Sequence, residues 1–115
     1  MRIERLDSVM YFARDFAQSL AFYRDTLGLE LLEVREGEYA EFVLGDGARF
    51  SLQRETCDGV SPPVAFVVVS DIKETLALLV GKGVEVLKPI THLNSATTAT
   101  ILDPSGNLIA LWQPK

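Results

Sequence analysis

The sequence has few of the residues that build metal centres, disulfides or nucleic-acid interfaces. It contains one cysteine and one histidine, and 16 acidic residues outnumber its 11 basic ones. A lone cysteine cannot form an internal disulfide, so we expect a reducing compartment, the cytoplasm. The net charge of −5 argues against nucleic-acid and anionic-membrane partners, which are themselves negative, and favours a neutral or cationic partner.

Long hydrophobic runs are also missing. The longest, residues 64–69, is far shorter than the about 20 residues of a membrane helix, and no basic and apolar leader opens the chain. We therefore expect a soluble, unprocessed protein. With 115 residues, 48% of them hydrophobic and 23% charged, the chain suits one domain, 1–115, with a single core.

Two segments of the sequence share one helical pattern. Asp15 opens the first segment, apolar residues recur at spacings of three and four up to Leu27, and Gly28 caps its end. Asp71, 56 residues later, opens the second, which contains a capping-box Glu74. Coincidental spacing in an ordinary α+β domain is the alternative, but four features match in order, so we interpret the pattern as a duplication.

Each copy reads strand, helix, strand, strand, strand. The strands flanking the predicted helices cover residues 9–13 and 28–31 in the first half, and 64–69 and 83–86 in the second. Each half then adds a hairpin with a turn-forming glycine, residues 39–44 with 49–54 and residues 96–102 with 108–113. Module one is thus about 1–54, module two about 64–115, and residues 55–63 form the linker.

Two motifs make the chain resemble the vicinal oxygen chelate superfamily, which includes glyoxalases, extradiol dioxygenases, fosfomycin-modifying enzymes and bleomycin-binding resistance proteins. They are DFAQSLAFYRDTLGL at residues 15–29 and DPSGNLIAL at residues 103–111. The resemblance implies an α+β fold in which two βαβββ modules pair into a half-open curved sheet that encloses a cup, with the helices on its outer face. Because the superfamily contains both metalloenzymes and plain binders, it does not fix the chemistry.

In the metalloenzymes of that superfamily, metal ligands come from four sheet positions. A divalent site needs three or four carboxylate, imidazole or thiolate groups that converge on one ion. Hydroxyl and hydrocarbon side chains cannot supply them, so we predict no metal and no cofactor. The four positions carry Ser8, Ser51, Val64 (or Pro63, if the alignment slips by one) and Ala110.

The remaining reactive side chains give little support to catalysis. His92 is predicted in the loop between the sixth and seventh strands, with no His, Cys or acidic residue at ligand spacing. Cys57 lies in the linker without a local base or a Cys-x-x-Cys partner, so we interpret it as a spectator thiol. We therefore predict no catalytic residues.

Strand alternation predicts which side chains face the cup, because residues two apart share a face. If the four family positions point inward, their neighbours two residues away do so too, and an apolar, aromatic surface with a few neutral hydrogen-bonding groups results. Such a surface is typical of a small-molecule pocket. The predicted ligand-binding residues are Ser8, Met10, Phe12, Ser51, Gln53, Phe66 and Trp112.

Two structural alternatives stay open at this point. The cup could be filled by its own side chains, because Met and aromatic residues at strand spacing are ordinary core residues. Trp112 is the stronger indication of a ligand site, since its ring offers a surface for a planar or cationic group. The acidic stretch with Glu33, Glu36, Glu38 and Glu41 reads as solvated hairpin surface, or as a rim that attracts a cation.

The sequence thus favours a metal-independent small-molecule binding protein that resembles the bleomycin-type resistance proteins, and that resemblance implies a homodimer. Its ligand would be aromatic or cationic. The alternatives are a glyoxalase- or dioxygenase-like lyase or isomerase, with a base from the acidic hairpin, and a partner-binding domain without a ligand pocket.

Overall fold

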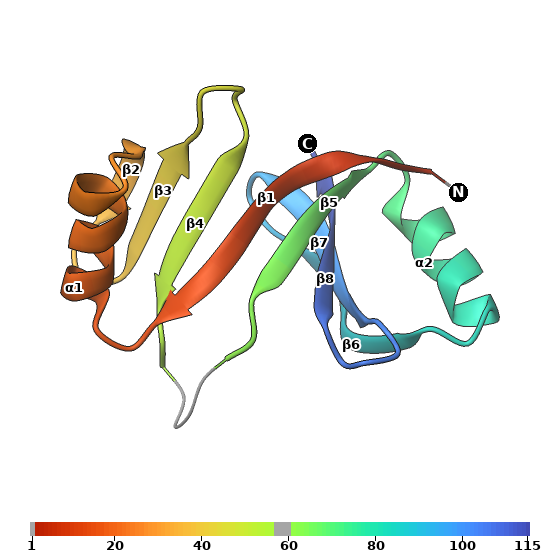
Figure 1. Ribbon diagram of the computed structural model, residues 1–115. Coiled ribbons are helices and arrows are strands. Elements are labelled where there is room, and N and C mark those ends of the chain that lie inside the picture. Colours follow the sequence, from red (N-terminus) through yellow and green to blue (C-terminus); the bar gives the residue numbers. More distant parts are fainter. Residues whose placement is uncertain (1, 57–60) are drawn as a thin grey trace. The chain divides into compact units, whose positions relative to one another are not determined.

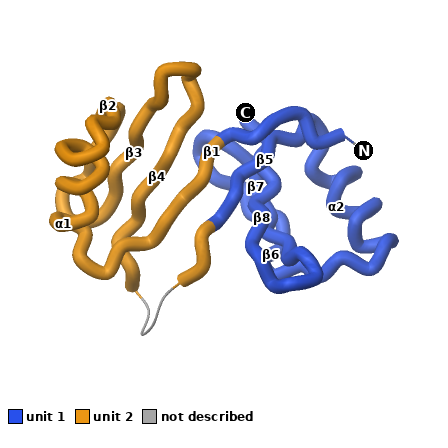
Figure 2. The backbone as a smooth tube through the Cα atoms, in the orientation of Figure 1, with its two compact units in different colours: residues 1–7, 64–115 blue, residues 8–63 orange. Residues whose placement is uncertain are grey.

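The computed structural model describes residues 2–56 and 61–115, and its path is drawn in Figure 1. It divides into two compact units, coloured in Figure 2. Unit 2 comprises residues 8–63, and unit 1 comprises residues 64–115 together with residues 1–7. The first strand therefore contributes to both units.

Unit 2 contains the first βαβββ module. Strand β1 (Ile3–Ala13) leads into α1 (Phe16–Ala21) and a π-helical turn (Phe22–Thr26), followed by β2 (Glu30–Arg35), β3 (Tyr39–Val43) and β4 (Arg49–Arg54). The strand order is β2-β3-β4-β1. Strands β2, β3 and β4 are antiparallel neighbours, while β1 runs parallel to β4.

Unit 1 repeats this arrangement. It consists of β5 (Val64–Val69), α2 (Ile72–Gly81), β6 (Glu85–His92), β7 (Ala96–Leu102) and β8 (Leu108–Pro114). Strand β5 runs parallel to β8, and β6, β7 and β8 are antiparallel neighbours. The full order, β2-β3-β4-β1-β5-β8-β7-β6, is that of an open mixed sheet, which confirms the predicted α+β fold with two βαβββ modules.

Both helices begin where the sequence predicts. The Asp15 carboxylate accepts a hydrogen bond from the Gln18 backbone N–H at 3.0 Å, and the Asp71 carboxylate accepts one from the Glu74 backbone N–H at 3.1 Å. Each bond satisfies an N–H group that the first helical turn leaves without a partner. Helix α2 has a further bond, because the Ile72 backbone N–H donates to Oε1 of Gln113 at 2.7 Å.

The end of the first helix differs from the prediction. The Leu27 backbone N–H bonds the Phe22 carbonyl at 2.9 Å, which closes a π-helical turn five residues long. The extra residue in this turn rotates Leu27 away from the sheet and leaves it 53% exposed. Leu29 instead packs against the buried residues of unit 2.

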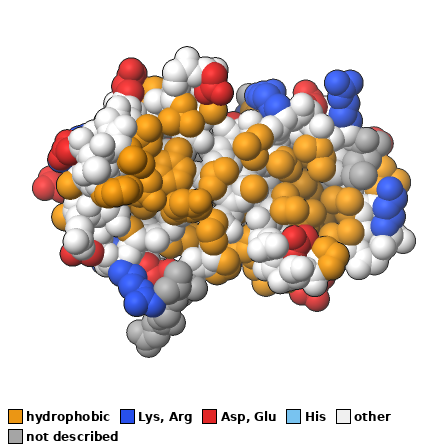
Figure 3. Space-filling model, in the orientation of Figure 1, with side chains coloured by type: hydrophobic (Ala, Val, Ile, Leu, Met, Phe, Trp, Pro, Cys, Tyr) orange, Lys and Arg blue, Asp and Glu red, His pale blue; other side chains and the backbone are white. Residues whose placement is uncertain are grey.

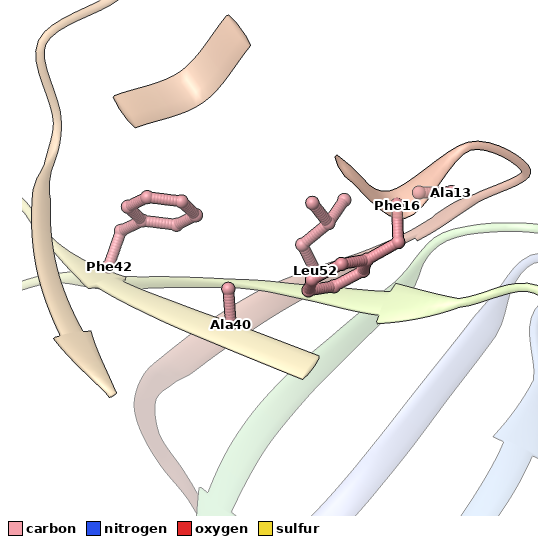
Figure 4. Packing of buried hydrophobic residues seen from close by; sticks show 5 residues of the cluster. All are labelled: Ala13, Phe16, Ala40, Phe42 and Leu52. Atoms are coloured by element: carbon pink, nitrogen blue, oxygen red, sulfur yellow. The ribbon is translucent and has the colours of Figure 1, made fainter. Parts of the chain in front are cut away.

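Each unit has its own core between helix and sheet. In unit 2, aromatic and aliphatic side chains from β1, β3, β4 and α1 meet, as Figure 4 shows. These residues are Ala13, Phe16, Ala40, Phe42 and Leu52. In unit 1 the corresponding residues are Val69, Ile72, Ala99, Ile101 and Leu111. Strand alternation also predicts that the residues between the cup-facing ones pack under the helices, and this is confirmed for Leu52 and Leu111 and for Phe50, Val67 and Ile109, which pack against the same cores.

Several strand boundaries require correction: β2 covers Glu30–Arg35 rather than 28–31, and β6 covers Glu85–His92 rather than 83–86. His92 lies in β6 rather than in the loop after it, opposite Thr97 of β7, and its Nδ1 lies 3.2 Å from the Thr97 Oγ1. Strand pairing, which the local sequence does not reveal, extends β6 to this residue. Strand β1 likewise begins at Ile3, well before the predicted residue 9. Cys57 lies outside the described residues.

No helix within residues 2–56 and 61–115 is long and apolar enough to cross a membrane. On the side of the molecule seen in Figure 3, hydrophobic side chains gather on both units, and charged side chains lie mostly around the periphery of each.

Candidate functional site: the sheet faces opposite the helices

The predicted residues of unit 2 share one face of its sheet. Leu52 and Ala13 lie in the core beneath α1, and Tyr11 contacts the Phe50 ring on that same side, with ring centroids 5.1 Å apart. Because side chains alternate along a strand, the residues between them point to the opposite side. We call this side, on which Ser8, Met10, Phe12, Tyr39, Glu41, Arg49, Ser51 and Gln53 lie, the helix-free face of unit 2.

Strand pairing brings the predicted residues of β1 and β4 next to one another. Met10 lies opposite Ser51 and Phe12 lies opposite Gln53 in the parallel register. Ser8 and Ser51 are buried, and Met10, Phe12 and Gln53 are half-buried. The structure therefore joins five predicted ligand-binding residues, Ser8, Met10, Phe12, Ser51 and Gln53, in one patch of unit 2.

A polar network that the sequence did not predict borders this patch. The Tyr39 hydroxyl donates to Oε2 of Glu41 at 3.1 Å and lies 3.4 Å from the Ser51 Oγ. Nη1 of Arg49 donates to Oε1 of the same carboxylate at 3.2 Å. The network therefore places the Tyr39 hydroxyl next to Ser51 and links it, through the Glu41 carboxylate opposite Ser51, to the Arg49 guanidinium group.

Burial and stacking hold Tyr39 in place. Desolvation raises the pKa of its hydroxyl above the usual value, so the group stays a neutral hydrogen-bond donor through the physiological range. The Arg35 guanidinium lies over the Tyr39 ring, 5.9 Å from the centroid, where cation–π attraction is favourable. Strand alternation could have predicted that Tyr39 and Glu41 lie on the helix-free face, because they alternate with the core residues Ala40 and Phe42.

The acidic hairpin divides into two parts. Glu36 and Glu38 are exposed at and beside the β2–β3 turn, as expected for solvated surface, and Glu33 pairs loosely with Arg35 at 3.8 Å. Glu41 differs, since only 16% of its side chain is exposed and it is bound by Tyr39 and Arg49. Glu33 lies opposite Glu41 in the β2–β3 register and so shares the helix-free face, but of these two carboxylates it is Glu41 that joins the network with Tyr39 and Arg49.

The remaining predicted residues lie on the corresponding face of unit 1. Val69 and Leu111 pack toward α2, so Val68 and Trp112, their neighbours in the chain, point to the opposite side. Phe66 shares that side, and its ring meets the Trp112 ring edge to face, with centroids 5.8 Å apart. Both aromatic side chains are half-buried, and we call this side the helix-free face of unit 1.

Residues 5–111 match the family model described as the Glyoxalase/Bleomycin resistance protein/Dioxygenase superfamily. The chain belongs to this superfamily, as the two sequence motifs indicated. No curated protein matches the chain at a significant level.

Solved structures show the same fold. A glyoxalase/bleomycin resistance protein/dioxygenase superfamily member from Vibrio splendidus 12B01 has a TM-score of 0.75 at 19% identity, with 95% of this chain and 97% of that chain covered. Methylmalonyl-CoA epimerase from Mycobacterium tuberculosis has a TM-score of 0.72 at 21% identity, with coverages of 98% and 89%. The Mn(II)-bound glyoxalase from Novosphingobium aromaticivorans has a TM-score of 0.74 at 20% identity, and 97% of this chain matches 39% of that one. At these identities the likeness concerns the fold alone.

The family's four metal-ligand positions do not fit a metal in this chain. Ser8 and Ser51 lie on the helix-free face of unit 2, and Val64 and Ala110 lie on that of unit 1. Two hydroxyls and two hydrocarbon side chains offer none of the anionic or imidazole groups that a divalent cation requires. Within residues 2–56 and 61–115, no three His, Cys, Asp or Glu side chains are grouped as a metal would need.

Proposed function

We propose that this chain is a metal-independent small-molecule binding protein of the glyoxalase/bleomycin resistance superfamily. The observation that carries this proposal is the chemistry of the family's ligand positions, which are Ser8, Ser51, Val64 and Ala110. Each lies on a helix-free face among mostly apolar, aromatic and neutral polar side chains, and on the unit 2 face the charged side chains of Glu41 and Arg49 bind each other.

The composition of these faces supports ligand binding without catalysis. Met10 and Phe12 supply apolar area, whose burial is worth about 25 cal/mol per Å². Ser51 and Gln53 supply hydrogen bonds that orient a ligand, and Tyr39 adds a hydroxyl held by Glu41. A few convergent polar groups on a largely apolar surface are typical of small-molecule sites.

The proposed ligand is aromatic and either neutral or cationic. Trp112 and Phe66 offer ring surfaces that attract planar and cationic groups. The net charge of −5 disfavours an anion. Arg49 balances the Glu41 carboxylate at 3.2 Å, so the network next to Ser51 does not itself demand a full positive charge on the ligand.

A thermal-shift screen with aromatic cationic antibiotics and small aromatic metabolites tests this function. A ligand at 100 times its dissociation constant should add about 2.7 kcal/mol to the free energy of unfolding. Trp112→Ala should lose most of that shift. The matched control is Phe22→Ala, which removes an exposed ring on the π-helical turn of α1 and should leave the shift unchanged.

The two faces can be tested separately. Gln53→Leu removes a polar group of the unit 2 face, and a reduced shift would assign the ligand's hydrogen bonds to that face. If no compound in the screen stabilises the chain, or if Trp112→Ala and Gln53→Leu both leave the shift unchanged, the proposal fails. The results would then favour a partner-binding domain without a ligand pocket.

A second candidate, a lyase or isomerase, is favoured by one observation. Glu41, from the acidic hairpin, lies on the helix-free face of unit 2 with its carboxylate held by Tyr39 and Arg49, where it could serve as a general base. Turnover of a ligand found in the screen, abolished in Glu41→Gln while the thermal shift persists, would establish catalysis over binding alone.

We also propose that the protein works in the cytoplasm as a homodimer. The lone cysteine supports the reducing compartment. Open sheet edges support self-association, since pairing satisfies their exposed backbone groups.

A further inference from the structure

The sheet order leaves two strands with only one neighbour. Within residues 2–56 and 61–115, β2 pairs only with β3, and β6 pairs only with β7. An edge strand presents unpaired N–H and C=O groups, and these groups can pair with a strand of another chain.

The β6 edge is poorly suited to such pairing. Its register with β7 shifts twice, between Val86 and Lys88 and between Lys88 and Thr91. Pro89 lies between these shifts and has no backbone N–H to donate. Irregular backbone, a proline and an exposed lysine are the features that keep edge strands from associating.

The β2 edge has exposed apolar side chains instead. Leu32 is 47% exposed and Val34 is 45% exposed, although both belong to a strand of the sheet. Its single register shift, at Leu32, leaves paired residues on both sides of the shift. The strand is charged at its two ends, acidic at Glu30 and basic at Arg35.

The sequence of β2 is complementary to itself in the antiparallel direction. If two copies align so that Glu30 of each lies opposite Arg35 of the other, Leu31 lies opposite Val34. Glu30 and Arg35 both lie on the helix-free face, because they pair with Val43 and Tyr39 of β3. Leu31 and Val34 both lie on the α1 side, because they pair with the core residues Phe42 and Ala40. The same register thus matches Glu30 with Arg35 on one face and Leu31 with Val34 on the other, and it places Leu32, at the register shift, opposite Glu33.

We propose that β2 is the dimer interface of this protein, pairing antiparallel with β2 of a second copy so that Glu30 contacts the partner's Arg35. The two-fold axis makes each contact twice, as in any isologous interface. The Arg35 side chain is 71% exposed and its bond to Glu33 within the strand is long at 3.8 Å, so it can reach the partner from its place over the Tyr39 ring. Opposite charges directly across a strand pair stabilise it, and like charges destabilise it.

Charge exchange tests both the interface and its register. We expect sedimentation equilibrium to show a reversible dimer, weakened about tenfold or more by Arg35→Glu, because two attractive contacts become repulsive. Glu30→Arg should weaken it similarly. The double variant Glu30→Arg with Arg35→Glu should restore the wild-type dissociation constant to within about threefold. Lys88→Glu, the matched control on the β6 edge, should leave it unchanged.

Cross-linking gives a second measure that does not depend on charge. In a Cys57→Ser background, a mixture of Glu30→Cys and Arg35→Cys chains should form an intermolecular disulfide under mild oxidation, because directly opposed residues have the short Cβ separation that a disulfide needs. Either variant alone should form far less. Far-UV circular dichroism and thermal unfolding establish that each variant is folded.

Three outcomes would overturn the proposal. One is a wild-type chain that stays monomeric up to about millimolar concentration, the second is a dimer that Arg35→Glu leaves intact, and the third is a folded double variant that does not regain association. This inference rests on the proposed homodimer. Ligand binding is measured independently, and Trp112→Ala should leave the dimer intact, so the interface and the proposed binding function can fail separately.

Discussion

Single polar residues in this chain fix turns that the hairpins depend on. In the β7–β8 turn, Oδ1 of Asp103 accepts hydrogen bonds from the backbone N–H groups of Ser105 at 2.9 Å and Asn107 at 2.8 Å. Its Oδ2 accepts from the Asn107 side-chain amide at 2.8 Å. Gly106 has a positive φ of 87°, which an L-residue rarely adopts. One carboxylate thus orders the whole turn that aligns β7 with β8.

Asp103 makes the stability of this turn depend on pH. The hydrogen bond from the Asn107 side chain, with the backbone bonds, lowers the pKa of the Asp103 carboxyl below its usual value. A lowered folded-state pKa contributes stability above the unfolded pKa of about 3.9, and that stability is lost as pH falls through the folded value. Asp103→Asn should therefore be less stable than the wild type at pH 7, and the gap should close toward pH 3.

Urea unfolding of both proteins at pH 7, 5 and 3 measures this gap. Asp103→Ala, which also removes the acceptors themselves, should retain a deficit at pH 3. A gap between wild type and Asp103→Asn that stays constant over this range would show that the charge of Asp103 does not contribute.

At the scale of elements, each unit is a sheet covered by one helix whose start is set by an aspartate. The two helices are not equivalent. Helix α1 ends in a π-helical turn and exposes Leu27, whereas α2 runs regularly for 10 residues and receives a second N-terminal bond from Gln113 of β8. The second module therefore ties its helix to the sheet by a side-chain hydrogen bond as well as by the core.

The N-cap of α2 gives a prediction at this scale. Asp71→Ala leaves the Glu74 N–H without its acceptor, so the free energy of unfolding should fall by about 1 kcal/mol. Asp71→Asn keeps an acceptor oxygen, so its free energy of unfolding should fall by only a few tenths of a kcal/mol. Urea unfolding at pH 7 distinguishes the two variants. Equal losses in both variants would mean that charge near the helix start, rather than the capping bond, provides the stability.

At the scale of the whole molecule, the residues that define function come from strands far apart in the sequence. Within unit 2, β1 and β4 place Met10 beside Ser51 across roughly forty residues of chain. Within unit 1, β5 and β8 place Phe66 and Val68 beside Ala110 and Trp112 in the same way. The duplicated topology thus builds the same kind of face twice.

The metal content of the protein depends on the whole molecule, since four strands contribute the family's ligand positions. Purified protein should contain far less than one equivalent of divalent metal by elemental analysis, because Ser8, Ser51, Val64 and Ala110 cannot hold an ion. Dialysis against a chelator should leave both the melting temperature and the ligand-induced shift unchanged. Stoichiometric metal, or a shift that disappears with the chelator, would contradict the binding mechanism proposed above.

Much of the fold is predictable from local pattern. The predicted strands 49–54, 64–69 and 96–102 agree with β4, β5 and β7 to the residue, because alternation and turn residues mark their ends. The helix starts agree because capping is a local hydrogen bond. Alternation also predicts that Leu52, between Ser51 and Gln53, and Leu111, next to Trp112, point away from the cup, and both lie in the cores beneath the helices.

The sequence by itself determined the two βαβββ modules, their superfamily and the metal-incompatible residues at the family's positions, because these depend on residue type and on spacing along the chain. Only the tertiary structure decided that a network of Tyr39, Glu41 and Arg49 borders Ser51, that His92 ends a strand, and that β2 is an edge strand among the described residues. The physical reason is that alternation fixes the side of a strand on which a residue points, whereas its neighbours there depend on which strands pair and in what register.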